Sequence, residues 1–115
     1  MNSIVTELQL TDFDADKCLL ELPDVSLMVF ISMGCASCRW AMAVLPTLDL
    51  PVMRLVWIDA AESAGLVQRY EVFHLPALFV VRDGQYFGAL HSPLTAADLT
   101  DALGVALSRS AEELP

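Results

Sequence analysis

Two of the three cysteines in this chain of 115 residues lie close together. Cys35 and Cys38 follow an apolar run at residues 26–32 and precede a segment of helix-forming residues. If a helix starts here, the second cysteine lies about one turn after the first, and both sulfurs lie near unpaired backbone N–H groups that favour a thiolate. The spacing therefore predicts a low-pKa nucleophilic thiol and a second thiol that resolves its disulfide.

The segments around the cysteines alternate between strand and helix patterns. Residues 26–32 are continuously apolar, as is typical of a central strand covered on both faces, and residues 39–45 favour a helix that Pro46 kinks or ends. Residues 52–58 then favour a strand, and residues 60–70 favour one helix with Leu66 and Tyr70 on one face. This alternation predicts a parallel sheet with crossover helices.

The C-terminal third predicts a hairpin and a final helix. Apolar runs at residues 77–82 and 85–90 flank Asp83-Gly84, and because both turn residues tolerate positive φ angles, an antiparallel hairpin is expected. Thr95 and Asp98 match a capping box, and the helix that they open carries an apolar stripe of Leu99, Leu103, Ala106 and Leu107. We expect a single domain over residues 1–109 and a frayed tail at residues 110–115.

The N-terminal segment favours a peripheral strand followed by a helix. Apolar and polar residues alternate over residues 4–10, and Asp14 stands three residues after Thr11, as in a capping box. The helix should end near Leu22, because Pro23 follows. Cys18 falls inside this helix, where we expect it to be a small buried apolar residue.

Composition indicates a folded protein and excludes two classes of partner. The chain is 56% hydrophobic, and 15 acidic residues against 6 Lys and Arg give a formal net charge of −9. Since no basic stripe is available to hold phosphates, we expect no nucleic-acid partner. No apolar run is long enough to span a bilayer, and the chain does not open on a basic and apolar leader. We therefore expect a cytoplasmic protein that does not associate with membranes.

Several further residues resemble marks of the thioredoxin family. The expected order, β-α-β-α-β-α-β-β-α with Cys-x-x-Cys after the second strand, is similar to that family over nearly the whole chain. Residues 57–59 resemble the end of its third strand, Leu75-Pro76 resembles its cis-proline dipeptide, and residues 82–85 resemble its hairpin. The resemblance implies an α/β protein with the thioredoxin fold, in which helices cover both faces of a central mixed sheet in three α/β/α layers.

The resemblance also implies a thiol-disulfide oxidoreductase that acts as a protein-disulfide reductase. Cys35 would attack a substrate disulfide, and Cys38 would resolve the mixed disulfide. Pro76 would follow a cis peptide bond that faces the cysteines, and the backbone of Leu75 would pair with an extended substrate segment. The implied partners are protein or peptide disulfides and an unidentified reductase or thiol as electron donor, and no cofactor is implied. The substrate-binding residues would be Gly34, His74, Leu75 and Pro76.

This sequence departs from the family at positions that set reactivity. The usual Trp-Cys-Gly-Pro-Cys is Gly-Cys-Ala-Ser-Cys at residues 34–38, so the stacking tryptophan and the stiffening proline are missing. Val29 occupies the place of a buried carboxylate that in thioredoxins helps to deprotonate the resolving thiol, and Ser92 stands where a groove glycine is common. Trp40 and Trp57 are interpreted as packing residues. These changes favour a specialised or slow reductase over a general thioredoxin.

Two other classes of function remain open. A binding or chaperone-like assembly module with little redox turnover would use an apolar rim of Met33, Gly34, Leu75 and Leu90. A metal site would use the thiolates of Cys35 and Cys38 with His74, but it would need a fourth ligand from elsewhere, for example from a second copy of the chain. A glutaredoxin-like enzyme is disfavoured because residues 74–76 do not resemble Thr-Val-Pro.

His74 is a candidate activator of Cys35. If the fold brings it near the thiol, an imidazolium would stabilise the thiolate together with the helix N-terminus. The competing interpretation is a solvated loop histidine or a substrate contact. We also predict that Cys35 and Cys38 form a reversible intramolecular disulfide in which Cys18 takes no part.

Overall fold

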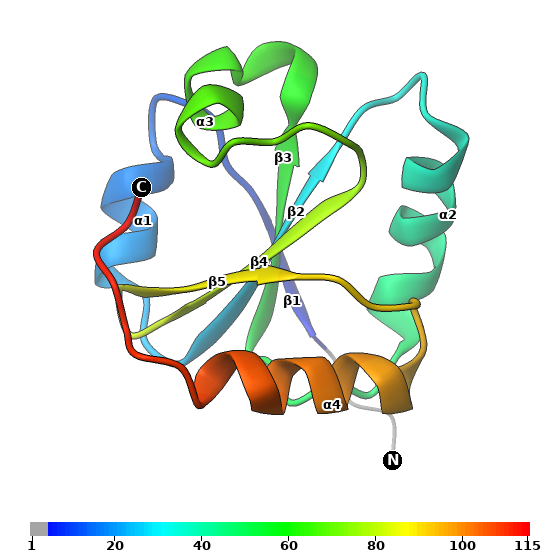
Figure 1. The fold of residues 1–115 in the computed structure, drawn as a ribbon. Helices are drawn as coiled ribbons and strands as arrows, with labels where there is room; N and C mark the ends of the chain where they lie inside the picture. Colours follow the sequence, from blue (N-terminus) through cyan, green and yellow to red (C-terminus); the bar gives the residue numbers. More distant parts are fainter. Residues whose placement is uncertain (1–4) are drawn as a thin grey trace.

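The centre of the protein is β2 (Val25–Ile31), the strand that leads to the cysteines. A computed structural model describes residues 5–115, and its five strands form one mixed sheet in the order β1-β3-β2-β4-β5 (Figure 1). β2 pairs in parallel with β3 (Arg54–Asp59) and antiparallel with β4 (Ala77–Arg82). β1 (Thr6–Gln9) and β5 (Gln85–Leu90) form the two edges. The predicted central strand and peripheral first strand are both confirmed.

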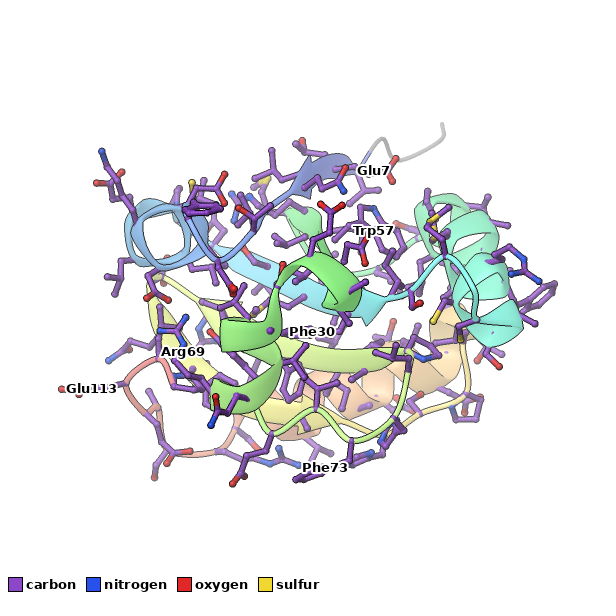
Figure 2. The ribbon with its side chains drawn as sticks, turned by 90° about the horizontal axis from the view of Figure 1, so that it is seen from above. Glu7, Phe30, Trp57, Arg69, Phe73 and Glu113 are labelled. Atoms are coloured by element: carbon purple, nitrogen blue, oxygen red, sulfur yellow. The ribbon has the colours of Figure 1, made fainter. Side chains whose placement is uncertain are left out.

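β2 is apolar on both faces because helices cover both sides of the sheet. Its side chains alternate between two buried clusters, with Val29 in one and Phe30 in the other. α2 (Ala36–Val44) and α4 (Ala96–Leu107) cover the first face, while α1 (Ala15–Glu21) and α3 (Ala64–Arg69) cover the second (Figure 1). Figure 2 shows Phe30 beneath α3. The predicted three-layer α/β/α arrangement is confirmed.

Local sequence signals account for the elements at the C-terminal side of the sheet. Asp83 and Gly84 have φ angles of 52° and 78°, which close the predicted two-residue hairpin between β4 and β5. The Thr95 Oγ1 accepts a hydrogen bond from the Asp98 N–H at 3.1 Å and so caps α4. Three of the four residues on the predicted stripe of α4 are fully buried: Leu99, Leu103 and Ala106.

β5 contains a β-bulge that the sequence did not predict. The register with β4 shifts between Val80 and Val81, which pair with Gly88 and Tyr86, so Phe87 is the extra residue. Gly88 has a φ angle of 96°, a conformation that strains residues with side chains. As a result, Tyr86 and Ala89 both pack on the α1/α3 side of the sheet.

The prediction of a single helix over residues 60–70 is wrong, because two shorter elements take its place. The 3₁₀ helix η2 (Ala60–Glu62) comes first, and α3 starts after Ser63. The Asp59 carboxylate accepts a hydrogen bond from the Ala61 N–H and holds η2 at the end of β3. Asp12, far away in the sequence, accepts from the Gly65 and Leu66 N–H groups at 3.1 and 2.8 Å. This long-range cap sets the start of α3.

Pro46 ends α2, which is one of the two outcomes that the sequence predicted. The chain continues as a single 3₁₀ turn, η1 (Leu45–Thr47), before it returns toward the sheet. β3 starts two residues later than predicted, at Arg54. Of the strand predicted at residues 4–10, residue 4 lies outside the described residues. β1 itself starts at Thr6.

The turn before α1 realises the predicted capping box only in part. The Asp14 carboxylate accepts from the Thr11 N–H at 2.7 Å, while the Thr11 Oγ1 accepts from the Phe13 N–H. α1 then starts at Ala15 and ends at Glu21, as expected from Pro23. Cys18 is half-buried and packs against the cluster on this face, so its predicted apolar role holds although its burial is incomplete.

The expectation of a frayed tail at residues 110–115 is wrong. Glu112 forms two backbone hydrogen bonds with Tyr86 of β5, at 2.8 and 2.9 Å, and Leu114 packs against the α1/α3 cluster. Figure 1 shows this tail running from the end of α4 past β5 to α1. Backbone pairing with a sheet edge orders the segment, which its polar sequence did not reveal. Within residues 5–115, no helix is long and apolar enough to cross a membrane.

Candidate active site

Cys35 occupies the N-cap position of α2, immediately after the loop that follows β2. Its backbone is extended, with φ −99° and ψ 118°, and its Sγ accepts a hydrogen bond from the Cys38 N–H at 3.1 Å. The thiol thus plays the part that an N-cap oxygen usually plays. The strand and the helix together fix this sulfur at the positive end of the helix dipole, as the sequence predicted.

The surroundings of Cys35 favour its thiolate. Its pKa lies below the ordinary value, first because the Cys38 thiol donates a hydrogen bond to it, then because the Cys38 and Ser37 N–H groups do, and because Arg39 adds positive charge. Partial burial opposes these effects without cancelling them. The Arg39 guanidinium is held near the site by a hydrogen bond to the Met33 carbonyl at 3.0 Å.

Cys38 is fully buried one turn further along α2, and its thiol has the opposite character. Burial in an apolar layer raises the pKa of Cys38 to about 11, and the hydrogen bond to Cys35 adds to this effect. Val29 is fully buried in the same cluster. Neither cysteine is in a disulfide. The site therefore pairs a thiol that ionises readily with one that stays protonated.

Leu75 and Pro76 lie opposite the first cysteine. The peptide bond between them is cis, and the Cys35 Sγ lies 3.9 Å from the Leu75 carbonyl oxygen, to which its S–H group donates. Leu75 is half-buried against both apolar clusters. Gly34 is exposed, and no other atom lies within 4 Å of the position that a Cβ would occupy. The backbone at Gly34 therefore leaves room for an incoming chain on one side of the sulfur.

A groove runs along the start of α2 beside these residues. Its volume is about 390 Å³, and its lining comes from three separate segments and includes Ser37, Trp40, His74, Pro76 and Ser92. Trp40 is 62% exposed, so the interpretation of this residue as a packing residue is wrong. Trp57 does pack against the α2/α4 cluster, and its Nε1–H donates to Glu7 at 2.9 Å (Figure 2).

The structure does not support His74 as the activator of Cys35. His74 is exposed, and its ring faces His91, with 6.2 Å between the ring centroids. Among the described residues, the groups that lower the pKa of Cys35 are Cys38, Ser37 and Arg39, and His74 is not one of them. Sequence reasoning missed Arg39, although its position four residues after Cys35 places it on the same side of a helix. His74 lines the groove instead.

The three groups proposed for a metal site do not form one. In the part of the chain from residue 5 onward, no group of three or more His, Cys, Asp or Glu side chains is arranged to hold a metal ion. The described ring neighbour of His74 is His91. The arrangement at the start of α2 is suited to thiol chemistry.

Comparison with solved structures identifies the fold. The chain is similar to human ERp44 in its form I, with a TM-score of 0.70 and 18% identity over 91% of this chain and 30% of that one. The zinc-bound form of human ERp44 gives a TM-score of 0.67 at 17% identity, over 90% and 30% of the two chains. The J-Trx1 fragment of ERdj5 gives 0.67 at 17% identity, over 89% and 52%. The chain has the thioredoxin fold.

These likenesses concern the fold, because all three identities are below one fifth. The chain spans about 30% of the length of ERp44 and 52% of the ERdj5 fragment. No family model and no curated protein matches the sequence. Within the thioredoxin fold, the Cys35–Cys38 pair has the Cys-x-x-Cys spacing and lies at the start of α2.

Proposed function

We propose that this protein is a thiol-disulfide oxidoreductase that reduces or exchanges protein or peptide disulfides through Cys35 and Cys38. The observation that carries this proposal is the contrast between the two thiols. Cys35 is accessible, N-caps a helix and has a lowered pKa, whereas Cys38 is buried directly behind it with a pKa raised to about 11. Nucleophilic attack and later resolution require one thiol of each kind.

The reaction begins when the Cys35 thiolate attacks one sulfur of a substrate disulfide. The substrate S–S bond breaks, a mixed disulfide forms, and the first substrate thiolate leaves and takes up a proton. Cys38 then loses its proton and attacks the Cys35 sulfur, which releases the second substrate thiolate and leaves a Cys35–Cys38 disulfide. Two electrons have passed from the dithiol to the substrate. Because Cys38 reacts within the same molecule, its high effective concentration compensates in part for its low thiolate fraction.

The backbone beside the sulfur gives the substrate a place to bind. An extended segment next to Leu75 would exchange main-chain hydrogen bonds with it, with Gly34 on the other side and Pro76 and His74 in the groove. Recognition would then depend on the shape of an extended peptide more than on its side chains. Return to the dithiol state requires a reductase or a small thiol as electron donor, and a cytoplasmic location, where such thiols are kept reduced, stays a prediction.

The proposal can be tested by counting thiols and trapping intermediates. Reduced protein is mixed with glutathione disulfide or with a peptide disulfide, quenched with acid, and analysed by mass spectrometry. We expect loss of two thiols per chain, with the disulfide located between Cys35 and Cys38, and accumulation of a mixed disulfide on Cys35 in a Cys38→Ser variant. Cys18→Ala is the matched control and should react like the wild type. An oxidised protein that retains three alkylatable thiols would refute the proposal.

A binding module with little redox turnover is the second candidate. It is favoured by two exposed apolar side chains beside the cysteines, Met33 and Trp40, which are 61% and 62% exposed. A variant with both Cys35→Ala and Cys38→Ala separates the two functions. If this variant binds unfolded peptides as tightly as the wild type does, and the wild type transfers no electrons to disulfides, binding is the function.

A further inference from the structure

A cavity separate from the groove lies between the loop after α3 and strands β4 and β5. Its volume is about 290 Å³, and most of its wall is apolar. Aromatic rings form one side: Tyr70 contacts Phe79 and Tyr86, with ring centroids 5.4 and 5.7 Å apart. These rings hold one another in place by edge-to-face packing, so the cavity has a rigid wall.

Phe73 lies at the mouth of this cavity and is 88% exposed. Figure 2 shows it in the loop after α3, at the outer edge of the molecule. A phenylalanine in this position adds little to the core, since almost none of its surface is buried in the fold. Its ring does, however, extend the apolar lining of the cavity outward, where it can contact a ligand.

The cavity exists because small residues and a bulge shape the edge of the sheet. The β-bulge at Phe87–Gly88 places Ala89 on the same face as Tyr86, and Ala77 lies on the neighbouring strand. Both alanines line the cavity, and a larger side chain at either position would occupy it. The space therefore depends on residue choices that an ordinary edge strand does not need.

The cavity adjoins the groove beside the cysteines. Four residues line both spaces: His74, Leu78, Leu90 and His91. His74 immediately precedes Leu75, whose carbonyl oxygen lies 3.9 Å from the Cys35 sulfur. Because an extended peptide advances about 3.3 Å per residue, we expect a substrate attacked by Cys35 to reach the cavity with a side chain within a few residues of its cysteine.

We propose that this cavity is a specificity subsite for an aromatic side chain of a peptide disulfide, located within three residues of the attacked cysteine. The inference rests on the proposed function and names a substrate class for it. Cavities of about 150 Å³ hold benzene. A volume of about 290 Å³ therefore accommodates the ring of a phenylalanine or tyrosine with its methylene group. The apolar, aromatic lining favours such a ring over a charged side chain.

The test uses heptapeptides with a central cysteine, each prepared as a symmetric disulfide dimer. One series carries a single phenylalanine at each position around the cysteine, with alanine elsewhere, and the reference peptide carries only alanine. The protein carries Cys38→Ser and Cys18→Ala, so that attack by Cys35 stops at the mixed disulfide, and the rate constant is measured by acid quench and mass spectrometry. We expect one or two phenylalanine positions to react about tenfold faster than the reference.

Two substitutions connect this advantage to the cavity. Phe73→Ala removes the ring at the mouth, and Ala89→Leu fills the space from within. Each should reduce the ratio of the phenylalanine rate to the alanine rate to less than about twofold. The matched controls are Phe13→Ala, which removes a phenylalanine that is 98% exposed before α1, and Ala97→Leu, at an exposed position of α4. Both controls should keep the full ratio.

Each outcome decides between the hypotheses. If all peptides react at equal rates, the subsite is refuted and the proposed function stands. If an aromatic advantage exists but survives both Phe73→Ala and Ala89→Leu, the cavity is not its origin. If neither glutathione disulfide nor any peptide forms a mixed disulfide with Cys35, the proposed function fails, and the subsite fails with it. Because the ratio is taken within each variant, a general loss of folding or reactivity does not imitate the expected result.

Discussion

The outer end of α2 and the apolar layer beneath it differ sharply in electrostatic environment, although only one helical turn separates them. At the outer end, N–H groups, a neighbouring thiol and Arg39 surround the Cys35 sulfur and favour its charged form. In the layer beneath, Cys38 has apolar neighbours such as Val29 and Ala41, and burial favours its neutral form. The comparison teaches that a three-residue separation along one helix can place two identical side chains in opposite electrostatic environments.

This contrast also divides the reaction into a fast half and a slow half. Attack by Cys35 uses a thiol with a lowered pKa. Resolution uses a thiol whose pKa of about 11 leaves it almost entirely protonated at neutral pH, with no buried carboxylate at residue 29 to accept its proton. We therefore expect the mixed disulfide to form readily and to persist, which agrees with the specialised or slow reductase that the sequence predicted.

The largest expected effect follows from removing each sulfur in turn. Cys35→Ser should lower the rate of mixed-disulfide formation by at least about a thousandfold, because a neutral hydroxyl does not attack sulfur. Cys38→Ser should leave that rate almost unchanged and abolish release of the second substrate thiol. Rapid acid quench followed by mass spectrometry measures both steps. Equal losses in the two variants would contradict the assignment of separate roles.

The second prediction concerns pH. In a Cys18→Ala background, alkylation of Cys35 by iodoacetamide should reach half of its maximal rate below pH 9.0, because its pKa is lowered, whereas Cys38 should do so near pH 11. Thiolates are the reactive form, so both rates rise with pH, and at pH 8 they should differ by at least about a hundredfold after correction for access. Peptide mapping distinguishes the two sites. If the pH–rate profiles of Cys35 and Cys38 coincide, the two thiols do not differ in electrostatic environment.

Val29→Asp should reduce the difference in reactivity between Cys35 and Cys38, because it changes the layer beneath Cys38. A carboxylate beneath Cys38 can accept its proton, so the resolution step should accelerate by at least about tenfold, while the buried charge should lower the free energy of unfolding by about 3 to 5 kcal/mol. Val29→Asn is the matched control, because asparagine has the same shape as aspartate and lowers stability similarly when buried, but it cannot accept the proton. Urea unfolding gives the stability change, and stopped-flow release of substrate thiol gives the rate. Equal acceleration by both variants would exclude proton transfer.

The smallest effect is expected at the groups around the outer thiol. Arg39→Gln should slow alkylation of Cys35 at pH 7 by less than about twofold, because the charge of an exposed arginine is screened by water. His74→Ala should leave the alkylation rate unchanged, since His74 is not among the groups that lower the pKa of Cys35. A larger change in the His74 variant than in the Arg39 variant would restore the histidine as the activator.

The sequence predicted best those features that short-range chemistry decides. The apolar run of β2, the Asp83-Gly84 turn and the cap of α4 by Thr95 depend on residues within a few positions of one another, and each was predicted correctly. The cysteine pair belongs to this class, because its place at a helix start needs only a strand before it and helix-forming residues after it.

Features that depend on distant residues were missed. The start of α3 is set by Asp12, more than fifty residues earlier, and no pattern within residues 60–70 reveals that cap. The position of His74 beside His91 depends on how the loop after α3 meets β5, and His74 is not among the groups that lower the pKa of Cys35. The exposure of Trp40 and the cavity behind Phe73 likewise result from the assembled fold, in which side chains from several segments surround one space.

The ordered tail also affects how this protein behaves toward copies of itself. The outer edge of β5 would otherwise present free backbone groups, which invite strand pairing between molecules and so promote aggregation. Here Glu112 pairs with both backbone groups of Tyr86, and Arg109 donates to the carbonyl oxygens of Phe87 and Ala89 at 3.4 Å. The last residues of the described chain thus protect one edge of the sheet, and removing them by proteolysis would expose an adhesive strand next to the proposed subsite.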